Sequence, residues 1–154
     1  MKKYWIFMAI GLMVLSLQAQ NKLVIDISNI ELIEGELMLR LTSNPELFDD
    51  GDLANEQLAR EEVNAHQMKI IFNDIPDGTY AFAIFQDLNE NEELDKRKFG
   101  IPAEPFVFSN NALGTFGPPK FSEASFDISG GSAHVQQVKM IYNKPKRKDR
   151  SNEK

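Results

Sequence analysis

Short segments in which apolar and polar side chains alternate constrain the fold of this chain most strongly. Residues 35–43 read GELMLRLTS, and Leu37, Leu39 and Leu41 occur at every second position. A period of two places these leucines on one face of an extended chain, which is typical of a half-buried β-strand. The segment is therefore predicted to be a strand with one face against a core.

Five other segments have strand character and are separated by turn residues: 22–28, 66–74, 79–87, 121–129 and 133–143. The Asp77-Gly78 pair predicts a tight turn before the third of these, and Gly130 lies in a GGS turn before the last. The segment 79–87 is apolar on both faces, as expected of a central strand. Almost no helical periodicity appears elsewhere, so we predict an all-β fold, an antiparallel β-sandwich of about seven strands.

A segment between two strands, residues 45–63, interrupts this pattern. It predicts a short helix over 53–62, with Leu53, Leu58 and Ala54 facing inward. An acidic run precedes this helix and consists of Asp49, Asp50 and Asp52. We interpret the run as a solvated loop, and a contribution to a cation site is the alternative.

The longest predicted loop runs from Asp87 to Lys120 and spans 34 residues. Loops of this length in compact domains are commonly functional or disordered. This one carries several large apolar side chains, namely Phe99, Ile101, Phe106, Phe108, Leu113 and Phe116. So much apolar surface favours burial, and we expect an ordered loop packed onto the sandwich.

The two ends of the chain differ from the middle. Residues 1–19 have Lys2 and Lys3 before a nearly apolar run and end at Ala19, the pattern of a secretory signal peptide. A membrane anchor is the alternative, but the apolar run is shorter than the ~20 residues that span a bilayer. Residues 144–154 are predicted to be a disordered basic tail. We therefore expect an exported protein, periplasmic or extracellular, whose folded domain covers 20–143 without stable membrane insertion.

Charge and cysteine content narrow the classes of partner. Without Lys2 and Lys3 the chain has 15 basic and 23 acidic residues, a net charge of −8, and residues 20–142 alone have a net charge of −12. An acidic body repels nucleic acid and attracts cations. Because the chain contains no cysteine, disulfides do not stabilise the domain, which leaves the core and a bound metal as the available sources of stability.

The sharpest motif follows the predicted central strand and reads DLNENEELD, residues 87–95. Side-chain oxygens stand at positions 1, 3, 5 and 9 of this segment, an alternation that wraps a Ca²⁺ ion efficiently. The expected ligands are Asp87, Asn89, Asn91, the main-chain carbonyl of Glu93, Asp95 and, closing the shell, Glu104.

The match to an EF-hand calcium loop is partial. Glu92 stands where that loop has glycine, and Lys98 stands where it has a bidentate glutamate. The alternative interpretation is an ordinary acidic turn, because Asn and Asp side chains favour turns by accepting hydrogen bonds from their own backbone.

The segment from Asp77 to Phe126 resembles an uncharacterised family of secreted bacterial proteins, the domain-of-unknown-function family 2141. The matching residues are Gly78, Tyr80, Ala81, Asp87, Asn89, Asn91, Leu94, Asp95, Gly100, Ile101, Pro102, Glu104, Phe108, Ser109, Asn110, Asn111, Pro119, Phe121, Ala124 and Phe126. Glu92 and Val107 depart from glycines that are common in the family pattern. The resemblance implies a prealbumin-like (transthyretin-like) sandwich and no established activity.

Catalytic motifs are missing from the sequence. It has no cysteine nucleophile, G-x-S-x-G elbow, H-E-x-x-H helix or glycine-rich phosphate loop. His66 and His134 are interpreted as surface or core-edge residues. We expect a non-catalytic binding module whose long loop is stabilised by calcium, with an unknown ligand, an envelope or extracellular protein, or a glycan as partner. A purely structural envelope protein without metal is the alternative, and a hydrolase is less favoured.

Overall fold

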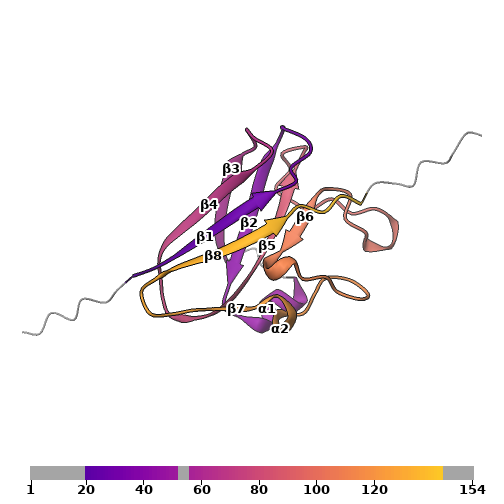
Figure 1. Ribbon diagram of the computed structural model, residues 1–154. Coiled ribbons are helices and arrows are strands. Elements are labelled where there is room, and N and C mark those ends of the chain that lie inside the picture. Colours follow the sequence, from indigo (N-terminus) through magenta and orange to yellow (C-terminus); the bar gives the residue numbers. More distant parts are fainter. Residues whose placement is uncertain (1–19, 52–55, 144–154) are drawn as a thin grey trace, which may run out of the picture.

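The computed structural model describes residues 20–51 and 56–143, which form two β-sheets packed face to face (Figure 1). The strands are β1 (Asn21–Ser28), β2 (Glu36–Thr42), β3 (Gln57–Glu62), β4 (Met68–Ile75), β5 (Gly78–Asp87), β6 (Phe106–Phe108), β7 (Phe126–Ile128) and β8 (Ala133–Lys139). The helices are α1 (Pro45–Asp50) and α2 (Phe121–Ala124), with 3₁₀ turns η1 (Lys98–Gly100) and η2 (Ser109–Asn111). The predicted signal peptide and basic tail lie outside the described residues.

The sheet order confirms an all-β fold and corrects one detail of its topology. One sheet has the order β4-β1-β8, and the other has the order β3-β2-β5-β6, with β7 paired to β5. All pairs are antiparallel except β1 with β8, which run parallel with Leu23 opposite His134. A wholly antiparallel sandwich was therefore the wrong expectation. As a consequence, the start of β1 and the end of β8 lie at opposite ends of the sandwich (Figure 1).

The core lies between the two sheets and has the predicted period of two. In β1, Leu23, Ile25 and Ile27 are at most 1% exposed while the residues between them are partly exposed. They form one cluster with the alternate leucines of β2 and with Phe82 and Ile84 of β5. Burying such side chains contributes about 1.5–3 kcal/mol each, so this shared face is the main source of stability.

The helix predicted over 53–62 is wrong for its described part, because Gln57–Glu62 is strand β3. This strand pairs with β2, where Ala59 lies opposite Leu39 and packs against the core, while Leu58 is 44% exposed. Ala, Leu, Arg and Glu favour helices in isolation, but pairing along an open sheet edge overrides that weak preference. Residues 52–55 lie outside the described residues.

A helix does form nearby, but it lies earlier in the chain. Asn44 caps α1 by accepting hydrogen bonds from the backbone nitrogens of Glu46 (3.0 Å) and Leu47 (3.3 Å), and Pro45 begins the helix. Asp49 of this helix accepts a hydrogen bond from the backbone N–H of Phe121 (2.6 Å). Asp49 of the acidic run therefore ties α1 to α2.

The strand predicted over 121–129 is helical at its start, because 121–124 forms α2 and only Phe126–Ile128 forms β7. The short strand β6 was not predicted. None of the helices in the described ranges is long and apolar enough to span a membrane.

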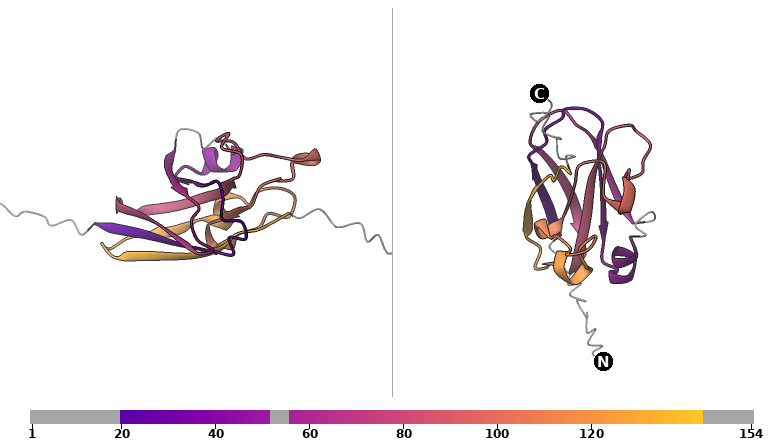
Figure 2. Two further views of the ribbon diagram at one scale, coloured as in Figure 1. Left: turned by 90° about the horizontal axis from the view of Figure 1, so that it is seen from above. Right: turned by 90° about the vertical axis from the view of Figure 1, so that its right-hand side faces the viewer.

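The long loop is ordered, but its apolar residues divide into two groups. Phe106 and Phe108 are half-buried and lie edge to face with centroids 5.9 Å apart, and Val107 between them is buried. Phe99 and Phe116, in contrast, are 97% and 102% exposed. The expectation that all of them pack onto the sandwich was therefore wrong for the loop tips, which project past the end of the sheets in the view from above (Figure 2).

Candidate metal centre

The candidate site begins where the central strand β5 ends. Its last residue, Asp87, is fully buried and pairs with Glu36 at the start of β2. Gly35 precedes that residue with φ +69°, and a Cβ there would collide with the carbonyl oxygen of Asp87. Only glycine combines this left-handed backbone with such a close approach. Gly35 thus fixes how β5 ends, a role that its Gly-Glu sequence alone does not reveal.

The Asp87 carboxylate organises the turn that follows. One oxygen accepts a hydrogen bond from the backbone N–H of Asn91 (3.2 Å), and the other accepts one from Glu92 (2.7 Å). The side-chain oxygen of Asn89 also faces the Asn91 nitrogen (3.3 Å), and that of Asn91 accepts from the Glu93 nitrogen (2.9 Å). The oxygens at positions 1, 3 and 5 therefore point into the same turn.

Asp95, at position 9, joins the same group of side chains. Its two oxygens accept hydrogen bonds from the amide nitrogens of Asn89 (2.8 Å) and Asn91 (3.3 Å). The structure therefore brings together Asp87, Asn89, Asn91 and Asp95, the four side chains that the spacing predicted. The side chain of Glu93 is exposed.

Glu104 lies at the base of the turn and binds both of its ends. The side chain is 4% exposed, and its oxygens accept hydrogen bonds from the backbone nitrogens of Leu88 (2.8 Å) and Asp95 (3.0 Å). Charge-assisted bonds of this kind are about twice as strong as neutral ones. Glu104 thus acts as a brace across the turn, a role that the ligand prediction did not include.

Glu92 takes the backbone conformation for which glycine was expected. Its φ is +65°, in the left-handed region that costs a non-glycine residue roughly 1–2 kcal/mol. Its carboxylate contacts Arg60 of β3 (2.7 Å), which also pairs with Glu36 of β2 (3.2 Å). The hydrogen bond that Arg60 donates to the Glu92 carboxylate raises the pKa of Arg60, which places a permanent positive charge beside the acidic turn. The turn therefore keeps its tight geometry without the glycine.

The turn supplies oxygen donors, which suit a hard cation such as Ca²⁺. Two of the four side chains are carboxylates and two are amides. Across residues 20–51 and 56–143, no group of three or more His, Cys, Asp or Glu side chains is arranged to hold a metal ion. The hydrogen bonds within the turn also fit the alternative interpretation, in which Asp and Asn side chains cap their own backbone.

The two histidines lie on different elements and have separate partners. His66 contacts the carbonyl oxygen of Ile30 through Nδ1 (2.6 Å), and His134 stacks on Phe126 with centroids 5.1 Å apart. These positions match the predicted surface and core-edge locations.

The family model for uncharacterized proteins conserved in bacteria, DUF2141, matches residues 25–136. The chain belongs to this family. The DUF2141 match runs from β1 into β8 and includes the whole acidic turn together with Glu104, so the candidate site lies inside the family domain. No curated protein and no solved structure gave a match.

Proposed function

We propose that this DUF2141 protein is an exported, non-catalytic binding module whose loop after β5 is stabilised by Ca²⁺. The observation that carries the proposal is the convergence of Asp87, Asn89, Asn91 and Asp95 on one turn, with Asp87 fully buried. The family resemblance supports the finer assignment of the sandwich to the prealbumin-like folds. The apolar segment at the start of the sequence supports export.

The charges around the turn favour a cation there. Asp87 and Glu104 are two buried carboxylates on one turn, and within the described residues neither forms an ion pair. Burial of a charge is costly unless it is compensated, and backbone N–H groups provide only part of that compensation. Two exposed glutamates, Glu90 and Glu93, add to the negative potential, whereas Glu92 is paired with Arg60. A divalent cation would offset this charge.

Calcium would be held by the side-chain oxygens of Asp87, Asn89, Asn91 and Asp95, with the main-chain carbonyl of Glu93 as a fifth donor. Ca²⁺ takes six to eight oxygens, and water would complete the shell. Glu104 serves this site by bracing the turn, and its carboxylate remains available as a further donor. When bound, the ion would supply charge neutralisation and rigidity rather than reactivity.

Calorimetric titration and thermal melting of the chain from Gln20 to Lys154 test the proposal. A ligand that binds only the folded state at about 100 times its Kd adds about 2.7 kcal/mol of stability, so chelation should lower the melting temperature by several degrees. Asp87→Asn, which removes a charge at nearly constant shape, should abolish the heat of calcium binding. The control is Asp74→Asn, because Asp74 is exposed and lies near the end of β4, before the turn into Gly78 and therefore far along β5 from Asp87.

The structural alternative makes the opposite prediction. If the acidic turn only caps its own backbone, calcium and chelator should give the same melting temperature and no heat of binding should appear. That result would refute the calcium proposal and favour a structural envelope protein without metal.

A further inference from the structure

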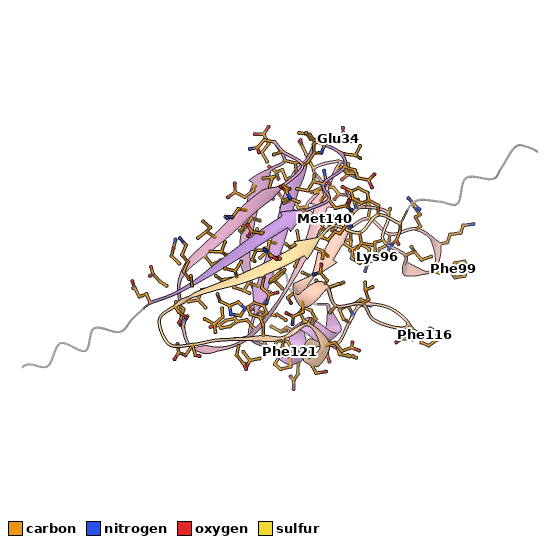
Figure 3. The ribbon with its side chains drawn as sticks, viewed as in Figure 1. Glu34, Lys96, Phe99, Phe116, Phe121 and Met140 are labelled. Carbon is orange, nitrogen blue, oxygen red and sulfur yellow. The ribbon has the colours of Figure 1, made fainter. Side chains whose placement is uncertain are left out.

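Two aromatic side chains, Phe99 and Phe116, project from the described part of the fold with almost no contact to it. We call them the aromatic tips. They are 97% and 102% exposed, and each has an exposed aliphatic neighbour in its loop, Ile101 (47%) and Leu113 (66%). Both tips project from the same side of the molecule (Figure 3). Contiguous exposed apolar surface marks interaction sites more often than single scattered side chains do.

The first tip is presented by a small hairpin built on the acidic turn. Ala103 donates to the carbonyl of Asp95 (2.7 Å), Lys96 bridges to Pro102, and Arg97 donates to the carbonyl of Ile101 (2.7 Å). At the tip Phe99 has φ +67°, a conformation that bulky residues rarely adopt. An exposed phenylalanine in a strained position contributes nothing to packing, so a role outside the fold explains its presence.

The second tip lies on a loop that is fixed at both ends. A Cβ at Gly114 would collide with the carbonyl oxygen of Gly117, so the loop closes tightly around Phe116. On one side Asn110 donates to the carbonyls of Ala124 (3.0 Å) and Ser125 (2.8 Å), and on the other Pro119 is buried. The loop therefore presents its aromatic tip from a fixed base.

Positive charge gathers beside the first tip although the body is acidic. Lys96, Arg97 and Lys98 are consecutive, exposed and part of the same hairpin as Phe99. Arg97 donates a hydrogen bond to the carbonyl of Asn143 (2.7 Å), the last described residue. From that point the sequence continues into a segment with six basic residues, Lys144, Lys146, Arg147, Lys148, Arg150 and Lys154.

We propose that the aromatic tips, together with Lys96, Arg97 and Lys98, dock this domain onto an anionic lipid surface. Two separate convex tips offer little matched area to a rigid protein partner, which needs about 800 Å² on each side. A lipid interface accepts isolated aromatic rings one by one, and each basic residue near it adds attraction to anionic headgroups. This proposal goes beyond the calcium site and does not require the turn to hold an ion.

Vesicle co-sedimentation tests the proposal with the chain from Gln20 to Lys154, which contains the described fold and lacks the apolar N-terminal segment. The vesicles are phosphatidylcholine alone or mixed with phosphatidylglycerol, each in chelator and in calcium. The wild type should sediment with the anionic vesicles in chelator. Phe99→Ser with Phe116→Ser should raise the lipid concentration for half-binding about tenfold or more, since burying one Phe is worth more than a tenfold step.

The matched control is Ile71→Ser with Val135→Ser, which removes two exposed apolar side chains (45% and 53%) from β4 and β8. This control should bind vesicles like the wild type, and thermal melts should show that both double variants fold. The proposal is overturned if the wild type ignores anionic vesicles in chelator, or if the tip variant binds them as well as the control does. Sedimentation velocity tests one further alternative. The proposal is also overturned if the wild type is a dimer that dissociates in the tip variant and no lipid binding occurs. Because the lipid assay in chelator requires no bound calcium, a negative result there does not depend on the result of the calcium titration.

Discussion

The acidic turn and the hairpin that follows it reverse the usual distribution of buried and exposed side chains. In the turn, the carboxylates Asp87 and Glu104 are 0% and 4% exposed, whereas a few residues away Phe99 is 97% exposed. Charged groups are rarely buried without partners, and large aromatic groups are rarely left in water. The same short stretch of chain thus keeps two carboxylates inside and presents an aromatic ring outside.

The two regions also differ in what holds them. Every buried carboxylate oxygen of the turn accepts a backbone hydrogen bond, so removing either carboxylate leaves at least one backbone donor without a partner. Phe99 is held by backbone bonds of the hairpin around it and its ring contacts almost nothing. The turn should therefore be sensitive to substitution, and the tip should tolerate it.

Gly35→Ala should have the largest effect on stability, because it acts at the junction of β2, β5 and the turn. The new methyl group would meet the Asp87 carbonyl, and the residue would be held at φ +69°. We expect a loss of about 3 kcal/mol or more in the free energy of unfolding, from left-handed strain plus the backbone shift. Chemical denaturation of the two proteins measures this loss.

Gly51→Ala is the control for Gly35→Ala. Gly51 has a similar φ of +73°, but nothing lies within 4 Å of a Cβ there. Gly51→Ala should lower the free energy of unfolding only by the cost of a left-handed backbone, roughly 1–2 kcal/mol. Equal losses for the two variants would contradict the close approach between Gly35 and Asp87.

Glu104→Ala should have the second largest effect. It leaves the backbone nitrogens of Leu88 and Asp95 without acceptors in a partly buried place. Each unsatisfied group costs about 1–3 kcal/mol, and we expect a total loss of about 2–3 kcal/mol by denaturation. Glu104→Gln keeps one acceptor oxygen and should lose about half as much. If the alanine and glutamine variants were equally stable, the brace across the turn would be refuted.

The sandwich was predictable because its core depends on a periodic signal. Alternation in residues 35–43 locates the inward face of β2, and the Asp77-Gly78 turn separates β4 from β5. Such local patterns arise because a strand turns every second side chain to the same face. The parallel pairing of β1 with β8 leaves no comparable trace in the sequence, since it depends on contacts between the two ends of the domain.

The sequence predicted which residues gather at the site, but it did not predict the role of each of them. The spacing of Asp87, Asn89, Asn91 and Asp95 found the gathered group, because side chains at alternate positions of a tight turn point inward. The bracing role of Glu104 depends on a tertiary contact across the loop. The misassigned helix over 53–62 failed for a related reason, since residues with helical preference formed an edge strand once β2 was available.

The exposed tips were missed because hydrophobic residues in a loop are ordinarily predicted to be buried. Nothing in the sequence around Phe99 distinguishes a packed ring from a presented one. Only the hairpin from Asp95 to Ala103 shows that the ring points away from the core. Sequence-based prediction of burial is expected to fail at residues that serve function rather than stability.

Phe99→Gly should have the smallest effect on stability and the opposite sign. Glycine relieves the strain at φ +67°, and the lost ring has almost no contacts to give up. The relief of roughly 1–2 kcal/mol offsets or exceeds the entropic cost of a new glycine, about 0.5–1 kcal/mol, so we expect a gain of up to about 1.5 kcal/mol. Phe116 is equally exposed but is not in the left-handed region. Phe116→Gly should therefore show only the entropic cost, a loss of about 0.5–1 kcal/mol.

Denaturation curves of the two variants measure these changes in the free energy of unfolding. Vesicle binding by both variants should weaken, although their stabilities change in opposite directions. If Phe99→Gly were the less stable of the two, the phenylalanine would be contributing to the fold, and the contrast between a structural turn and a presented tip would fail.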